Sequence, residues 1–168
     1  TMMAAYFGKD KLLKKLLDGY KIRYEQIIEE QKKILSGKSI LIFSYNSNLD
    51  WIVKTIRDLG MKLEKICFVR SAENEDMPLD CDVDVEYGFN ESERYLLIEK
   101  LKPDIVLAHI NPVNVIEGVH YDTMPYYPKL GFFSGLELSK KWVQIFSIDF
   151  DEGWRNEKKL FSELQFKS

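Results

Sequence analysis

The polar residues that could do chemistry in this sequence follow two short apolar runs. Tyr45-Asn46-Ser47-Asn48 comes after the run Ser39–Ser44, and a segment that begins with His109 comes after the run Asp104–Ala108. Amides and tyrosine hydroxyls donate and accept hydrogen bonds, and histidine titrates near neutral pH. Such groups suit a polar or anionic ligand, to which Arg70 could add positive charge. We therefore expect a tentative binding cleft formed by Asn46, Asn48, His109, Asn111 and Tyr126.

The elements that must position these groups are parallel strands. The run Ser39–Ser44 is almost continuously apolar, as is typical of a strand covered on both faces. Apolar residues at helical spacing follow, with Asn48 as the expected N-cap and Gly60 as the stop. The next apolar run is Ile66–Val69. Strand, helix and strand predict a right-handed crossover, and ligands of such sheets bind beyond the carboxyl ends of the strands.

A long helical pattern precedes the first strand. Between Asp10 and Leu35, apolar residues recur every three or four positions with Lys and Glu between them. Gly19 could divide this helix at a modest cost. Two interpretations stay open: the helix packs on its own domain, or its first half packs on a partner chain or on an absent domain.

The remaining segments complete an α/β pattern. We expect a short edge strand at Val83–Tyr87, a helix capped by Asn90 or Ser92 that ends before Pro103, and a buried strand at Asp104–Ala108. A last helix is predicted from Gly131 to Ile148. The predicted fold is a Rossmann-like three-layer sandwich of about four mostly parallel strands with helices on both faces. We divide the chain into a long helix (1–36), the α/β domain (37–148) and a helical tail (149–168).

Composition narrows the function. The 168 residues are 45% hydrophobic and 30% charged, with a net charge of −3 that argues against a nucleic-acid binder. No apolar stretch approaches the length of a membrane span, and two cysteines, Cys67 and Cys81, favour a reducing cytoplasm. The glycine motifs of dinucleotide and P-loop sites are missing. We expect no metal site in this chain, a structural role for His120, and binding more than catalysis.

Four segments between about Tyr24 and Phe146 form a recognisable pattern when taken together. They are the helix into Leu35–Ile42, Leu59–Leu63, Ile98–Val106, and Gly118–Tyr121 through Gly131–Gly135. In their order and spacing they resemble the last Rossmann-type subdomain of nitrogenase component 1-type proteins. Within that family they are closest to the molybdenum–iron protein alpha chain and its cofactor-assembly relatives.

The resemblance implies a several-domain, two-subunit metalloprotein whose cluster-ligating cysteines lie largely in an earlier domain. In the alpha chain a Met-His pair supplies a cofactor ligand, whereas this chain has Met124-Pro125, and His120 is displaced from that position. The implied function is a domain or fragment of a nitrogenase-like oxidoreductase that acts as scaffold or as half of a cofactor or substrate cleft. An absent domain or partner would then supply the iron–sulfur or related cluster.

The isolated chain is expected to hold no cofactor and to lack catalytic competence. Expected partners are another subunit or domain of such a complex, a reductase, or a second copy of the chain bound through the N-terminal helix; nucleic acid and membrane are not expected. The alternative is a non-catalytic module of the same fold that binds a small molecule or a protein.

Overall fold

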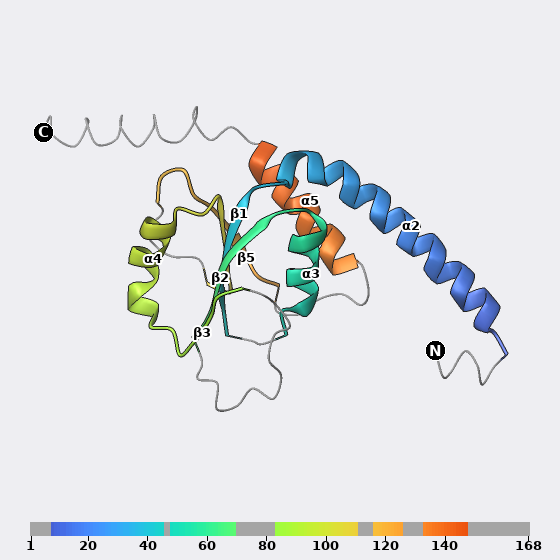
Figure 1. Cartoon of the computed structure of the whole chain (residues 1–168), viewed down its shortest axis with the longest axis horizontal. Coiled ribbons are helices and arrows are strands. Elements are labelled where there is room, and N and C mark those ends of the chain that lie inside the picture. The colour runs from blue at the N-terminus through green and yellow to red at the C-terminus, as the bar shows by residue number, and fades with distance from the viewer. Residues whose placement is uncertain (1–7, 46–47, 70–82, 111–115, 126–132, 148–168) are drawn as a thin grey trace, which may run out of the picture.

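The fold is a five-stranded parallel sheet between helices on both faces. The computed structural model describes residues 8–45, 48–69, 83–110, 116–125 and 133–147. The strand order is β3-β2-β1-β4-β5 (Figure 1). The strands are β1 (Ser39–Ser44), β2 (Lys62–Phe68), β3 (Val85–Tyr87), β4 (Ile105–Ala108) and β5 (His120–Thr123). This architecture confirms the predicted α/β class, and β1 and β4 are adjacent in the interior as expected.

Strand β1 is the middle of the sheet and is buried on both faces. It pairs in parallel with β2 and β4, with Ile42 opposite both Ile66 and Leu107. The register with β2 shifts between Ile40 and Leu41, where Glu64 is the extra residue. Apolar residues that alternate along β1 therefore enter two separate cores.

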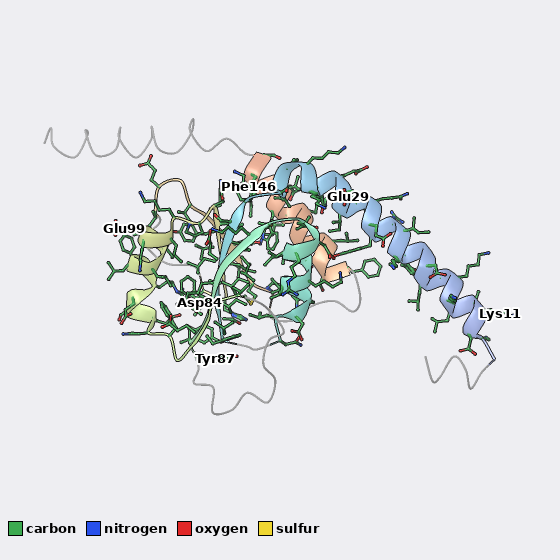
Figure 2. The ribbon with its side chains drawn as sticks, in the orientation of Figure 1. Lys11, Glu29, Asp84, Tyr87, Glu99 and Phe146 are labelled. Atoms are coloured by element: carbon green, nitrogen blue, oxygen red, sulfur yellow. The ribbon has the colours of Figure 1, made fainter. Side chains whose placement is uncertain are left out.

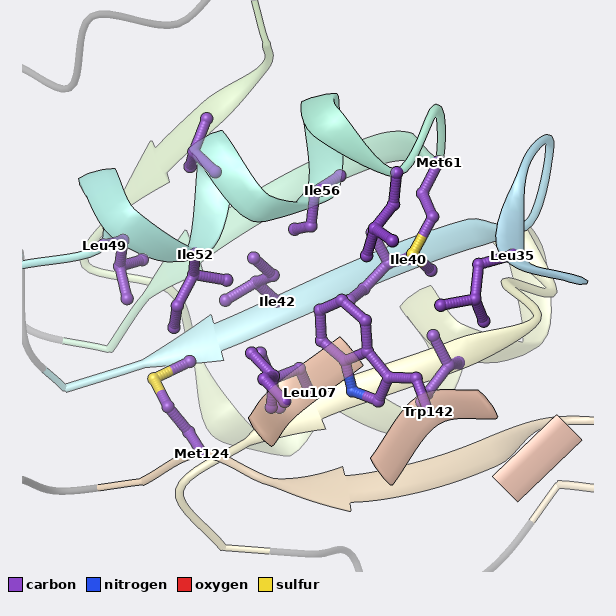
Figure 3. Packing of buried hydrophobic residues seen from close by; sticks show 14 of the residues in the cluster. Leu35, Ile40, Ile42, Leu49, Ile52, Ile56, Met61, Leu107, Met124 and Trp142 are labelled. Carbon is purple, nitrogen blue, oxygen red and sulfur yellow. The ribbon is translucent and has the colours of Figure 1, made fainter. Parts of the chain in front are cut away.

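The two cores lie on opposite faces of the sheet. On one face, Ile40 and Ile42 pack under α2 (Asp10–Leu35), α3 (Asp50–Asp58) and α5 (Phe133–Ser147), around Trp142 (Figure 3). On the other face, Leu41 and Phe43 pack under α4 (Arg94–Leu101), which follows the single turn η2 (Glu91–Glu93). This alternation explains why the sequence of β1 is continuously apolar.

Helix α2 runs unbroken through Gly19 and extends well beyond the sheet (Figure 1). Its buried side chains, Tyr24, Ile28 and Leu35, all lie in its second half. The Tyr24 hydroxyl donates to Asp58 Oδ2 at 2.6 Å, which ties α2 to the end of α3. Within the described part of the chain, no helix is both long enough and apolar enough to cross a bilayer.

Two sequence-based expectations differ from the structure in detail. Strand β5 brings the sheet to five strands; it is a half-buried edge strand of only four residues, so it lacks the apolar run of an interior strand. Leu49, not Asn48, holds the N-cap position of α3, and no side chain caps that helix. The expected Asn90 cap is confirmed, since its side chain accepts from the Ser92 N–H. The last helix is described from Phe133 to Ser147, and the tail 149–168 lies outside the described residues.

We predict that Ile42→Asp strongly destabilises the protein. The side chain of Ile42 is fully buried in the centre of the sheet, where a carboxylate has no partner. An unpaired buried charge costs several kcal/mol, on the order of half of a domain's marginal stability. Leu96→Asp is the matched control because Leu96 is exposed on α4. Urea denaturation measures both variants, and equal loss of stability in the two would contradict the position of β1.

A second prediction concerns the crossing of α3 and α5. A Cβ atom added to Gly135 would lie 2.5 Å from Thr55 Oγ1, whose hydroxyl is held by the Trp51 carbonyl at 2.7 Å. Gly135→Ala should therefore cost about 1–3 kcal/mol of unfolding free energy through overpacking. Gly19→Ala is the control, since its Cβ meets nothing within 4 Å, and it should gain up to about 1 kcal/mol of helix propensity. A stabilised Gly135→Ala would show that the two helices are not in close contact.

Candidate functional site

Four side chains gather where β1 and β4 end. Tyr45 follows β1, His109 follows β4, and Glu91 and Arg94 come from the start of the α4 segment. The Tyr45 N–H donates to His109 Nδ1 at 3.4 Å, and the two rings meet edge to face with 5.7 Å between their centres. The Tyr45 hydroxyl donates to Glu91 Oε1 at 3.0 Å. We call Tyr45, Glu91, Arg94 and His109 the edge cluster.

Arg94 is the charged centre of the edge cluster. Only 6% of the residue is exposed, and its guanidinium lies over the Phe43 ring, with Cζ 4.8 Å from the ring centre. One terminal nitrogen donates to Glu91 Oε1, and the other donates to the Ile110 carbonyl oxygen at 2.8 Å. Its Nε is buried and has no hydrogen-bond partner among the described residues. Arg94 thus joins the start of α4 to the end of β4.

His109 is held as a neutral hydrogen-bonding group. It is buried, and this burial lowers the pKa of its imidazole. Because Nδ1 accepts from the Tyr45 N–H, the neutral ring carries its proton on Nε2. The neutral ring therefore resists protonation near neutral pH.

The structure describes two of the five predicted cleft residues. His109 lies at the carboxyl edge of β4 as expected, beside Tyr45. Asn48 is exposed just before α3, a helix that covers the face opposite α4. Asn46, Asn111, Tyr126 and Arg70 lie outside the described residues, so convergence of the full cleft stays a prediction.

Sequence reasoning missed Glu91 and Arg94. Their i, i+3 spacing at a helix start is a visible signal, but an ordinary one, because most such pairs are solvated. A second buried polar centre, Asp122, was also missed. Its carboxylate accepts from Lys141 Nζ and, at 3.1 Å, from Trp142 Nε1, and so ties β5 to α5. Both partners lie on α5, so we assign Asp122 a structural role.

None of the four edge-cluster side chains is a serine, threonine or cysteine nucleophile. The Ser44 hydroxyl, on the other face of β1, donates to Met124 Sδ at 3.6 Å. Cys67 is buried within β2, and burial raises the pKa of its thiol to about 12. A neutral histidine, a tyrosine hydroxyl and a satisfied Glu–Arg pair are suited to orienting a polar ligand by hydrogen bonds.

The parallel sheet, helices on both faces and polar carboxyl edge define a Rossmann-like α/β domain. A family model described as nitrogenase component 1 type oxidoreductase matches residues 2–147. The chain therefore belongs to the nitrogenase component 1-type oxidoreductase family. No curated protein sequence matches the chain.

Two solved structures share the fold. Nitrogenase Cp1 at pH 6.5 aligns with a TM-score of 0.64 and 15% identity over 86% of this chain. Nitrogenase Cp1 at pH 5 aligns with a TM-score of 0.67 and 16% identity over 91% of this chain. The chain covers 41% and 39% of those two proteins. It thus spans about two fifths of their length.

The described residues do not fit the iron–sulfur cluster that the family implies. Clusters are held by several thiolates, usually about four cysteines. Cys67 is buried in β2 with a raised thiol pKa, and Cys81 lies outside the described part. Among the described residues, no group of three or more His, Cys, Asp or Glu could hold a metal ion. The His120 ring packs edge to face on Phe146, with 4.8 Å between ring centres, as a structural histidine would.

We predict a pH dependence of stability that His109 contributes to. The pKa of His109 in the folded protein lies below the ~6.5 of an unfolded chain. Below pH ~6.5 the unfolded chain therefore binds more protons, and the free energy of unfolding falls as pH falls through the folded pKa. His109→Gln should flatten this decline by up to ~1.4 kcal/mol per pH unit.

The matched variant is His120→Gln, because burial and the Lys38 charge also lower the pKa of His120. Chemical denaturation between pH 7.5 and 5 measures the wild type and both variants, with the double variant flattest of all. Parallel curves for the wild type and His109→Gln would show that His109 titrates as in the unfolded chain.

Proposed function

We propose that this chain is a scaffold domain of a nitrogenase component 1-like oxidoreductase and provides half of a cleft for a cofactor or substrate. The observation that carries the proposal is the family match over residues 2–147 in a chain that spans only about two fifths of the structurally similar nitrogenase proteins. In this proposal, another domain or subunit supplies the cluster ligands. The oxidoreductase activity belongs to the assembly, to which a separate reductase would deliver electrons, and the assembly is cytoplasmic.

The edge cluster is the part of the cleft that this chain contributes. Parallel sheets bind ligands beyond the carboxyl ends of their strands, and Tyr45 and His109 lie at that edge. In this proposal the chain positions a cofactor without ligating it. The tentative cleft of Asn46, Asn48, His109, Asn111 and Tyr126 remains part of this proposal.

A second candidate function is a non-catalytic binding module of the same fold. The edge cluster favours it too, because a neutral histidine beside a tyrosine can hold a small polar molecule without any cluster. The two functions differ in whether iron accompanies the assembled protein.

Metal analysis of the assembled protein separates the two functions. The tagged chain is purified without oxygen from its native cells, and iron and acid-labile sulfide are measured in the complex and in the chain after separation. We expect iron and sulfide in the complex and little iron on the separated chain, because thiolates are scarce in it. Cys67→Ala should leave the iron content of the complex unchanged, since Cys67 is buried in β2.

Stoichiometric iron on the separated chain would overturn the scaffold role. A complex free of iron and sulfide would favour the binding module.

A further inference from the structure

The apolar face of α2 continues past the domain. Tyr24, Ile28 and Leu35 are buried against the domain, and the same face repeats toward the N-terminus at Leu13, Leu17 and Tyr20. Successive positions are three, four or seven residues apart, so all six lie along one side of the helix. Figure 2 shows the N-terminal half of α2, with Lys11 near its end, projecting away from the sheet. The helix face that packs on the domain in the second half of α2 is thus exposed in the first turns of α2.

The uncovered face consists of apolar side chains. Leu12, Leu16, Leu17, Tyr20 and Phe133 are each between 46% and 55% exposed, and Leu13 is half-buried beside them. The Phe133 ring, at the start of α5, meets the Tyr20 ring edge to face with 6.1 Å between centres. We call Leu12, Leu13, Leu16, Leu17, Tyr20 and Phe133 the docking face. Contiguous apolar surface of this kind marks a site of interaction.

The positive charge around the docking face indicates what kind of partner can bind there. Residues 9–23 carry six cationic side chains against two carboxylates, a net charge of +4 within a chain whose net charge is −3. The cationic residues are Lys9, Lys11, Lys14, Lys15, Lys21 and Arg23. A second copy would bring the same +4 against this segment, and like charges across an interface are repulsive. The occupant should therefore carry carboxylates.

The docking face includes residues of two elements. Tyr24 lies on the same face of α2 as Leu17 and Tyr20, and its hydroxyl reaches Asp58 on the domain. Phe133, at the start of α5, meets the Tyr20 ring edge to face. A partner helix about 10 Å wide can contact α2 and Phe133 together.

We propose that the docking face binds an amphipathic protein helix whose apolar stripe is flanked by carboxylates. This inference rests on the proposed function, because it names the surface by which the scaffold holds its partner subunit or domain. Helix-in-groove contacts of this type place apolar anchors three and four residues apart, as the docking face does. The lysines would pair with the flanking carboxylates and set the orientation of the partner.

The test measures binding of two labelled three-heptad peptides by fluorescence anisotropy, at concentrations where each peptide is monomeric. Both peptides carry leucine at heptad positions a and d; one carries glutamate and the other lysine at e and g. The full chain should bind the glutamate peptide at least about tenfold more tightly, with an affinity that weakens as salt rises. Leu16→Glu should remove this binding. Leu96→Glu, at a position 63% exposed on α4, is the matched control and should leave it unchanged.

Charge reversal is the sharper arm of the test. Lys14→Glu/Lys21→Glu should shift the preference toward the lysine peptide, because it changes the charge around the docking face and leaves its apolar residues in place. Equal affinity for the two peptides, or binding that survives Leu16→Glu, would overturn the proposal. So would a dimer of the chain that Leu16→Glu dissociates, or tighter binding to phosphatidylglycerol vesicles than to the glutamate peptide.

The peptide readout does not depend on iron. Loss of the acidic preference would therefore refute the docking proposal alone, whereas an iron-free native complex with intact peptide binding would refute the proposed function alone.

Discussion

The carboxylate of Asp104 fixes the register of the two central strands. Its Oδ2 accepts from the Ser39 N–H and the Ser39 hydroxyl, each at 2.8 Å, and its Oδ1 accepts from Lys38 Nζ at 3.0 Å. The Asp104 N–H in turn donates to Ser39 Oγ at 2.9 Å. Burial alone would raise the pKa of Asp104, but these hydrogen bonds and the Lys38 charge hold it below its usual value. The carboxylate thus stays ionised and keeps the starts of β1 and β4 together.

Both cores and the edge cluster depend on that register. A slip of one residue would move every side chain of a strand to the opposite face of the sheet. With Phe43 opposite Ala108, Tyr45 and His109 emerge next to each other at the far end of the strands. Phe43 then lies under Arg94, which bonds to the Ile110 carbonyl. The contacts of Tyr45, His109 and Arg94 at the carboxyl ends of β1 and β4 therefore agree with the register that the Asp104 hydrogen bonds set at the starts of these strands.

The sequence predicted the interior of this fold better than its margins. Strands β1 and β4 and helix α2 follow from apolar runs and helical spacing, which local residues determine. Strand β5 could not be found that way, because an edge strand of four partly polar residues gains its structure from pairing with β4. His109 was predicted at the correct edge, but Glu91 and Arg94 became recognisable only when tertiary packing brought residues 45, 91 and 110 together. Asn46, Asn111 and Tyr126, which were also predicted for the cleft, lie outside the described residues.

Hydrogen exchange of backbone amides, followed by mass spectrometry on the free chain and on its native complex, tests the account most directly. We expect the sheet around β1 to be stable by itself, whereas the first half of α2 needs a partner. In the free chain, amides of β1 should exchange most slowly and those of residues 10–22 far faster, because few buried contacts hold that part of the helix. In the complex, residues 10–22 should become protected while β1 changes little. Slow exchange of residues 10–22 in the free monomer, or fast exchange of β1, would contradict the account.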